Sequence, residues 1–524
     1  MLKRLRVGLA AVFWLGITLL FLDISGVLHH YLGWMAKMQF LPAVLALNTG
    51  VIVALALLTL VFGRVYCSII CPLGVFQDGI SWLRAHRSKK PYQYHKEMVW
   101  LRYGVWVVFV ASLVAGGSVL VSLLAPYSAY GRMVGNLLQP LYLWGNNLLS
   151  WAAERAGSYA FYPREVWFKG VSSLVVALVT LAVVGVMAFR GGRSYCNDIC
   201  PVGTTLSFLS RFAMFRPVID TQKCRHCKAC EHHCKARCIA IGKDNARIDY
   251  SRCVDCFNCL EECKFDALQY RFAWRSVSTK KGPMVDGTPK KADASTNSSQ
   301  NVETATNKAT NPTAEGRRAF LAGTALAVGG AALSGITARA QEAAKKVDGG
   351  LAEVLPKQTP PREVPLTPPG RVGVRDFYRR CNACQLCVAA CPNGILRPSE
   401  LLEHLMEPEM GFERGFCRPE CTRCSQVCPT GSIRPIGREE KTQYHVGTAR
   451  VNPEACISAT GASICGKCHQ ICPSGAISLV DNPANGHRLP VVAESLCTGC
   501  GACEHYCPVR PVSAITVNGK FEHL

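Results

Sequence analysis

The sequence predicts an α-helical membrane bundle, with four helices plus a fifth signal or anchor helix, joined to small α+β ferredoxin-like domains that bind [4Fe-4S] clusters. Three observations predict this fold class. Four long apolar segments occupy the first 190 residues. The chain has 29 cysteines, most of them in closely spaced groups of four. An arginine pair followed by a weakly apolar segment lies in the middle of the 524 residues rather than at their start.

The four apolar segments are residues 7–22, 41–62, 103–124 and 171–189. Each is long enough, or nearly so, to cross a bilayer. Basic residues flank them, and by the positive-inside rule both ends of this domain, residues 1–215, are cytoplasmic while residues 126–169 face out. The flanking residues are Lys3, Arg4, Arg6, Arg64, Arg84, Arg87, Lys89, Lys90, Lys96, Arg102, Arg190, Arg193, Arg211 and Arg216.

The net charge of +22 therefore indicates membrane topology before nucleic acid. No helix-turn-helix, zinc-finger or RNA-binding motif is visible in the sequence, so nucleic acid is not an expected partner.

An internal repeat lies at the two cytoplasmic exits. Residues 63–74 and 192–203 match at eight of twelve positions, and each carries a Cys-x3-Cys-Pro loop. Such similarity indicates two related helix pairs, and cysteines at i and i+4 share a helix face. We expect a pseudo-twofold to bring Cys67, Cys71, Cys196 and Cys200 near one another as a shared redox or metal site. The alternative is that they are buried small apolar residues, and the metal is left open.

Residues 216–275 are predicted to be a cytoplasmic ferredoxin domain with two clusters. Two quartets repeat the spacing C-x2-C-x2-C-x3-C, in which three close thiolates hold one cubane and the fourth reaches the other. One cluster is expected on Cys224, Cys227, Cys230 and Cys263, and the other on Cys253, Cys256, Cys259 and Cys234. Lys235 and Lys264 replace the usual proline, and the extra Cys238 could substitute for Cys234. Zinc is the weaker alternative.

Residues 374–524 hold four more quartets, each followed by proline as in the ferredoxin signature. Because the outer two share one spacing and the inner two are both stretched, we expect nested pairing; sequential pairing is the competitor. A Cys-x2-Cys-His sequence at Cys465 also matches haem attachment, but its cysteines complete a quartet. The total is six [4Fe-4S] clusters. The four quartets are Cys381, Cys384, Cys387, Cys391; Cys417, Cys421, Cys424, Cys428; Cys456, Cys465, Cys468, Cys472; and Cys497, Cys500, Cys503, Cys507.

The middle of the chain separates the two cysteine-rich parts. Residues 276–316 have almost no large apolar residue, which predicts a disordered linker. Arg317 and Arg318 then precede an apolar segment that ends in a small-x-small site at Ala340. Residues 317–340 thus resemble a twin-arginine export signal, the alternative being an alanine-rich helix, and 341–373 form a Pro-rich spacer. We expect five crossings of a bacterial inner membrane, a cytoplasmic N-terminus and a periplasmic four-cluster domain. Cleavage after Ala340 is left open.

These motifs resemble two families. The four helices, both Cys-x3-Cys-Pro loops and the two following quartets resemble the membrane ferredoxin-type protein NapH and its relative MauN. The arginine pair at 317–318 and the four quartets, the third stretched at Cys456–Cys465, resemble NapG and its relative MauM. The resemblance implies a fusion that oxidises quinol from the membrane pool. It further implies electron delivery to a periplasmic reductase of nitrate-reductase type, or to its cytochrome.

The residues themselves indicate electron relay, because cubane clusters carry single electrons and no nicotinamide, flavin or Walker motif is visible. Quinol oxidation also needs bases, and polar groups near membrane segments tend to be functional. We expect a quinol site at Asp23, His29 and His30; the alternative is that they are interfacial residues with no role. The chain would then be a quinol dehydrogenase-type component. The alternative function is a maturation or regulatory factor for a periplasmic metalloenzyme, with thiol or metal chemistry at the loops.

Overall fold

The computed structural model describes residues 1–23, 25–87, 91–167, 169–243, 245–273, 346–348, 352–483 and 486–523. The predicted linker at 276–316 and export signal at 317–340, with Arg317, Arg318 and Ala340, lie outside the described residues.

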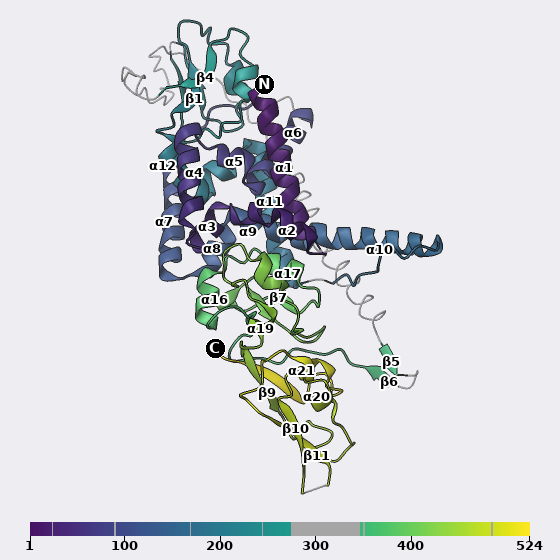
Figure 1. Cartoon of the computed structure of the whole chain (residues 1–524). Coiled ribbons are helices and arrows are strands. Elements are labelled where there is room, and N and C mark those ends of the chain that lie inside the picture. The colour runs from purple at the N-terminus through teal and green to yellow at the C-terminus, as the bar shows by residue number, and fades with distance from the viewer. Residues whose placement is uncertain are drawn as a thin grey trace, which may run out of the picture. The chain divides into compact units, whose positions relative to one another are not determined.

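Four helices overlap the predicted apolar segments (Figure 1): α1 (Leu2–Leu22), α4 (Thr49–Phe62), α7 (Val99–Ala115) and α11 (Val171–Gly191). Of the described helices, α1 and α11 are long and apolar enough to cross a membrane by length and composition, whereas α4 and α7 are shorter. The membrane character of the chain thus rests on two helices in the described part, not four.

The two middle segments are interrupted, contrary to the prediction of continuous helices. Residues 41–62 divide into α3 (Phe40–Leu45) and α4, because Leu47 has φ 54° and the Asn48 side chain caps α4 by accepting from Val51 N at 3.2 Å. Residues 103–124 divide into α7 and α8 (Ser118–Leu124) at Gly116, whose φ of 81° no helix tolerates. The asparagine N-cap of α4 and the glycine C-cap of α7 therefore interrupt the two segments, and the apolar pattern of the sequence did not predict either interruption.

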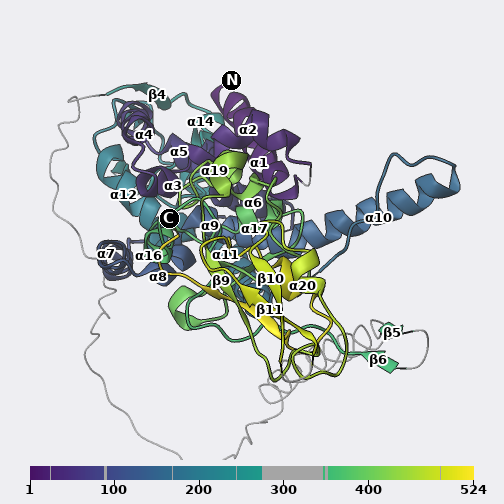
Figure 2. The same ribbon diagram turned by 60° about the horizontal axis from the view of Figure 1, so that its bottom comes forward.

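Shorter helices complete the bundle. The predicted outer loop at 126–169 contains α9 (Pro126–Met133), η1 (Val134–Leu138) and α10 (Gln139–Arg155), and α10 projects away from the other helices (Figures 1 and 2). Helix α2 (Val27–Lys37) follows α1. The two Cys-x3-Cys-Pro loops consist of α5 (Val65–Ile69) leading into α6 (Pro72–Arg87), and η2 (Tyr195–Ile199) leading into α12 (Pro201–Ser210).

The first cluster domain is a small α+β unit. Strand β1 (Phe215–Ile219) pairs antiparallel with β4 (Leu268–Phe272), with Phe215 opposite Phe272. Strands β2 (Ile239–Ile241) and β3 (Ala246–Ile248) pair in the same way. Helices α13 (Ala229–His232) and α14 (Asn258–Glu261) each lie inside one of the two quartets.

The second cluster domain consists of two α+β halves. Its first half holds α16 (Val374–Arg380), α17 (Leu386–Ala390), η3 (Leu402–His404) and α18 (Arg423–Val427), with β7 (Leu396–Pro398) antiparallel to β8 (Pro408–Met410). Helix α19 (Arg438–Lys441) leads to the second half. There β9 (Gly447–Val451) pairs with β12 (Ile515–Gly519), and β10 (Ile477–Asp481) with β11 (Arg488–Val492). Helices α20 (Lys467–Gln470) and α21 (Ala502–Tyr506) complete it. Separately, β5 (Lys346–Asp348) pairs with β6 (Ala352–Val354).

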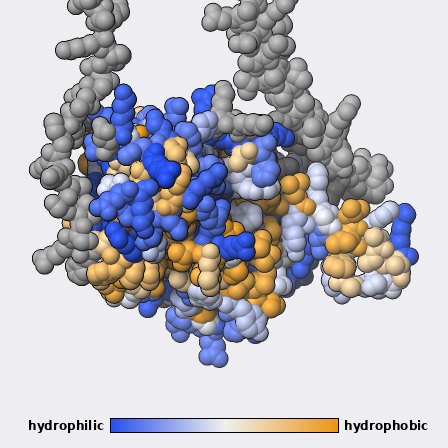
Figure 3. Space-filling view, turned by 90° about the horizontal axis from the view of Figure 1, so that it is seen from above, coloured by the Kyte–Doolittle hydropathy of each residue, from blue (hydrophilic) through white to orange (hydrophobic). Residues whose placement is uncertain are grey.

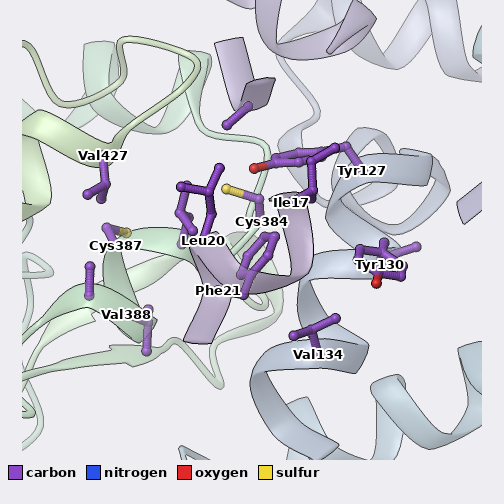
Figure 4. Close-up of a cluster of buried hydrophobic side chains, with 14 of the residues drawn as sticks. Ile17, Leu20, Phe21, Tyr127, Tyr130, Val134, Cys384, Cys387, Val388 and Val427 are labelled. Atoms are coloured by element: carbon purple, nitrogen blue, oxygen red, sulfur yellow. The ribbon is translucent and has the colours of Figure 1, made fainter. Parts of the chain in front are cut away.

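The hydrophobic core runs without a break from the bundle into the second cluster domain. Ile17, Leu20 and Phe21 of α1 are buried with Tyr127 of α9 against Cys384 near α17 (Figure 4). On the outer surface, hydrophilic residues gather over part of the face seen in Figure 3 and hydrophobic residues beside them.

Candidate metal centres

The eight quartet cysteines of the first domain enclose two small cavities, as the crossed ferredoxin rule predicts. One is lined by four cysteines: Cys224, Cys227, Cys230 and Cys263. The other is lined by Cys234, Cys253, Cys256 and Cys259, together with Cys238. Because a cubane takes four thiolates around one volume, both cavities fit a [4Fe-4S] cluster.

The lysine that replaces proline after Cys234 attaches this domain to the bundle. Its ammonium lies 3.7 Å from Asp78 Oδ1 of α6, and its carbonyl accepts a hydrogen bond of 2.9 Å from Arg193 N. The extra thiol of Cys238 is buried 3.6 Å from that of Cys234, so it lines the second cavity as a fifth cysteine. Lys235 and Cys238 therefore both lie at the Cys234 cavity, whereas Lys264 follows Cys263 of the other cavity.

The four quartets of residues 374–524 pair sequentially, and the nested prediction was wrong. Cys391 of the first quartet lines one cavity with Cys417, Cys421 and Cys424 of the second. In return, Cys428 lies close enough to Cys384 and Cys387 for their charges to interact. In the other half, Cys472 lies with Cys497, Cys500 and Cys503, and Cys456 lies with Cys465 and Cys468. The longer cysteine spacings of the second and third quartets therefore reflect longer loops and do not indicate that these two quartets pair with each other.

The structure brings the two Cys-x3-Cys-Pro loops together. All four of their thiols are buried: Cys67, Cys71, Cys196 and Cys200. The second cysteine of each loop stands at the N-terminus of a helix, where Cys200 Sγ accepts from Gly203 N at 3.4 Å and Cys71 accepts from the backbone N–H of Gly74. Helix N-termini and N–H donors stabilise thiolates, so this is an arrangement suited to metal ligands.

Two arginines link the loops reciprocally. Arg64 of the first loop donates to the Cys196 carbonyl at 3.1 Å, and Arg193 of the second donates to the Cys67 carbonyl at 2.7 Å. Each guanidinium also lies 3.9 Å from the first cysteine sulfur of its own loop. Both arginines are fully buried. Sequence reasoning used them as topology markers and missed this role, although both occupy the same position of the repeat.

Burial raises the pKa of the Cys71 thiol, and the neighbouring Cys196 and Cys67 raise this pKa further. Burial likewise raises the pKa of Cys200. Without a metal these thiols stay protonated at neutral pH, and a metal that binds them must displace their protons. Among the described residues, no three His, Cys, Asp or Glu side chains, in the loops or in the quartets, converge closely enough to hold a single metal ion.

One flank of the loop site carries an ion cluster. Asp78 of α6 is buried and accepts from Arg193 Nε at 2.9 Å and from Arg6 Nη1 at 2.6 Å. The preceding residue, Gln77, donates to Cys196 Sγ at 3.1 Å. A buried carboxylate of this kind requires paired cations, and here they come from α1, the second loop and the first cluster domain.

The predicted quinol residues separate into a buried pair and an exposed residue. Asp23 Oδ2 lies 3.1 Å from His29 Nδ1, and the His29 side chain is 7% exposed. Burial alone would raise the pKa of Asp23, but hydrogen bonds from Ser25, His29 and Gly26 hold it below its ordinary value. Burial lowers the pKa of His29 in spite of Asp23. His30 is exposed and its ring packs on Tyr31, so the structure does not bring it to the pair.

Known proteins resemble both parts of the chain. A family model described as a 4Fe-4S binding domain matches residues 45–91 and 173–218, which carry the two loops, and a 4Fe-4S dicluster domain matches residues 463–510. The methylamine utilization ferredoxin-type protein MauM of Paracoccus denitrificans is 34% identical over 204 residues, 36% of this chain and 82% of the relative. Ferredoxin-type protein NapG of Escherichia coli is 30% identical over 203 residues, 37% and 81% of the two chains.

The chain belongs to the MauM and NapG family of ferredoxin-type proteins.

Its other part resembles ferredoxin-type protein NapH of Escherichia coli, with 25% identity over 242 residues, 45% of this chain and 71% of the relative. The chain is thus a fusion of NapH-like and NapG-like parts, which confirms the resemblance read from the motifs. These relatives and domains support iron–sulfur electron transfer as its activity. No solved structure matches the chain.

Proposed function

We propose that this protein, with six [4Fe-4S] clusters on its quartets, is a membrane electron-transfer component. It oxidises quinol and passes the electrons through [4Fe-4S] clusters to a periplasmic reductase or its cytochrome. The observation that carries the proposal is that the two cluster domains contact opposite ends of α1. At its start, Lys3 Nζ pairs with Glu261 of the first domain at 2.6 Å. Just beyond its end, the Ser25 carbonyl accepts from Arg423 of the second domain at 2.6 Å.

The length of α1 matches the thickness of the hydrocarbon core of a bilayer. Its 21 residues rise about 1.5 Å each, or roughly 31 Å, which matches a hydrocarbon core of about 30 Å. If α1 spans the bilayer, the two cluster domains lie on opposite sides. This supports an inner-membrane protein with the N-terminus and two-cluster domain in the cytoplasm and the four-cluster domain in the periplasm. A twin-arginine signal at 317–340 would deliver the exported part with its clusters already folded.

His29 is the base that we assign to quinol oxidation. Asp23 holds its Nδ1, and in the described part of the chain His29 Nε2 is buried with no hydrogen-bond partner. Helix α2 packs on α18, the helix that carries Cys424. Quinol loses two protons and two electrons on oxidation. His29 Nε2 accepts one proton and outer water the other, while two clusters each accept one electron.

The test is reduction of the clusters by a quinol analogue in membranes that contain the full chain. We expect His29→Gln to slow this reduction by about 10²–10⁴-fold, the usual contribution of a positioned base. Direct reduction by dithionite should be unchanged. The matched control is His30→Gln, which should behave as the wild type. Wild-type rates in His29→Gln, with dithionite-reducible clusters intact, would refute the assignment.

The same site predicts a pH dependence. Because the pKa of His29 lies below its ordinary value, the imidazole is neutral at pH 7 and can accept a proton. As the pH falls through this lowered pKa, His29 becomes protonated, and the rate of quinol-dependent reduction should fall in parallel. Stopped-flow absorbance between pH 7.5 and about 5 measures this. A rate that is equally pH-dependent in His29→Gln would assign the base elsewhere.

A maturation or regulatory role is the second candidate, favoured by the buried, protonated thiols of the two loops. It predicts that quinol analogues do not reduce the clusters and that loop variants fail to activate a partner metalloenzyme. The same membrane assay separates the two functions.

A further inference from the structure

We propose that the two Cys-x3-Cys-Pro loops together hold a seventh iron–sulfur cluster on Cys67, Cys71, Cys196 and Cys200. The two segments that match a 4Fe-4S binding domain contain only two cysteines each. A cubane requires four thiolates, so neither segment supplies a cluster alone. The structure joins the segments through the reciprocal arginine contacts, and all four thiols are buried. Cys196 lies close enough to Cys67, Cys71 and Cys200 for their charges to interact.

The surroundings of the four thiols suit an anionic cluster. A [4Fe-4S] centre with four thiolate ligands carries net negative charge, which a buried site must compensate. The compensating cations here are Arg64 and Arg193, whose guanidinium groups lie 3.9 Å from Cys67 Sγ and Cys196 Sγ. Amide donors from Gly74, Gly203 and Gln77 also point at three of the four sulfurs. Hydrogen bonds to sulfur are a regular feature of cluster sites.

The position of the loops gives the centre a place in the electron path. The first loop contacts the backbone two residues before Cys253, because Arg64 Nη1 donates to the Ser251 carbonyl at 3.1 Å. The second loop contacts the backbone two residues after Cys234, because Asn197 Nδ2 donates to the Ala236 carbonyl at 3.1 Å.

On the face away from the cytoplasmic domain, the fully buried Arg132 interacts with Tyr195 of the second loop and with Cys384 of an exported quartet. The loop centre is therefore an intermediate between the cytoplasmic pair of clusters and the exported set. The direction of electron flow through it rests on the proposed function, but the binding of a cluster does not.

Iron and acid-labile sulfide analysis of the purified full-length chain tests the proposal. Six clusters hold about 24 iron atoms and seven hold about 28. We expect about 28 in the wild type and a loss of about four in a Cys71→Ser, Cys200→Ser double variant, with the disappearance of one EPR signal. The matched control is Tyr66→Phe, which alters the first loop without removing a thiol and should retain all the iron. A wild-type count of about 24 that the double variant leaves unchanged would overturn the proposal. A loss of one metal atom would instead indicate a single ion, and would also overturn it.

If the double variant does not fold, Arg193→Lys gives a second measurement. It keeps all four thiols, so the iron count should stay at about 28, while the midpoint potential of one EPR signal shifts. Seven signals with none shifted would argue against a cluster beside this arginine. A quinol-reduction assay separates this proposal from the proposed function. In the double variant, a quinol analogue should still reduce the exported clusters but no longer the cytoplasmic pair. Failure to reduce any cluster in the wild type would refute quinol oxidation and leave the iron count to decide the seventh cluster.

Discussion

The two Cys-x3-Cys-Pro loops share a sequence pattern but differ in their surroundings. Both place the second cysteine at a helix N-terminus and both receive an arginine from the opposite loop. They differ one turn later, where α6 has Gln77 and Asp78 but the equivalent positions of α12 are Leu206 and Ser207. The pseudo-twofold thus places the thiols, while Asp78, which has no counterpart in the second loop, connects the loops to α1 and the first cluster domain. The residues that the two loops share therefore position the four thiols, and the residue that they do not share attaches the loops to neighbouring elements.

Removing the one-sided carboxylate should have the largest effect. Asp78→Asn leaves Arg193 and Arg6 buried without their counter-charge, which costs about 3–5 kcal/mol in comparable sites. Thermal unfolding of the detergent-solubilised protein, followed by cluster absorbance, should show a clearly lower Tm. The equivalent position provides the control, because Ser207→Ala removes one hydrogen bond of 2.6 Å to the Thr204 carbonyl and should cost only about 0.5–1.5 kcal/mol. Equal losses at the two positions would show that Asp78 has no special role.

The shared part of the loops should respond symmetrically. A methyl group on Gly74 would overlap the Cys67 carbonyl, and one on Gly203 would overlap the Cys196 carbonyl. We expect Gly74→Ala and Gly203→Ala each to cost about 1–3 kcal/mol, as overpacking does, with similar losses of loop-bound iron. Gly79→Ala on the exposed side of α6 is the control, since nothing lies within 4 Å of its added methyl. It should be neutral or stabilising. A penalty at one glycine and not the other would contradict the pseudo-twofold.

The smallest expected effect comes from replacing Gln77, a residue in which the two loops differ. Gln77→Leu gives the first helix the residue that the second already has and removes the N–H donor 3.1 Å from Cys196 Sγ. Because hydrogen bonds to sulfur raise cluster potentials, the midpoint of the loop centre should fall while the iron content stays constant. Potentiometric EPR measures this, and the signals of the six quartet clusters serve as internal controls. An unchanged set of midpoints would mean that this donor does not act on a cluster.

Much of this arrangement could be predicted from spacing alone. The 2-2-3 intervals dictate crossed pairing in the first cluster domain, and the repeat at a constant offset anticipates that the two loops meet. Cysteine spacing does not reveal which quartets pair in a domain with four of them, because the packing of successive helices decides the pairing. Helix α17 packs on α18 and α20 packs on α21, and the pairing is therefore sequential. Hydropathy also failed to reveal Leu47 and Gly116, where a positive φ interrupts a helix inside an apolar run.

The role of Arg64 shows a further limit. A basic residue at the end of an apolar segment is read as a sign of orientation, since charge near the membrane surface has that effect. Its burial depends on a carbonyl contributed by residue 196, which no local pattern around residue 64 contains. The repeat aligns Arg64 with Arg193, which indicates a shared role for the two arginines. That role could be identified only once the structure placed the two loops against each other.

The close approach of α9 to the second cluster domain has a consequence for assembly. Gly131 has no room for a side chain, because an added methyl would reach the Cys384 carbonyl and the Phe21 ring. Such a close-fitting surface must be reached by diffusion when its two sides are separate proteins. In the uncleaved chain residues 277–357 connect them covalently, so docking becomes an intramolecular event governed by effective concentration. The contact can therefore be small and still remain occupied at any expression level, and the two parts are always present in equal numbers.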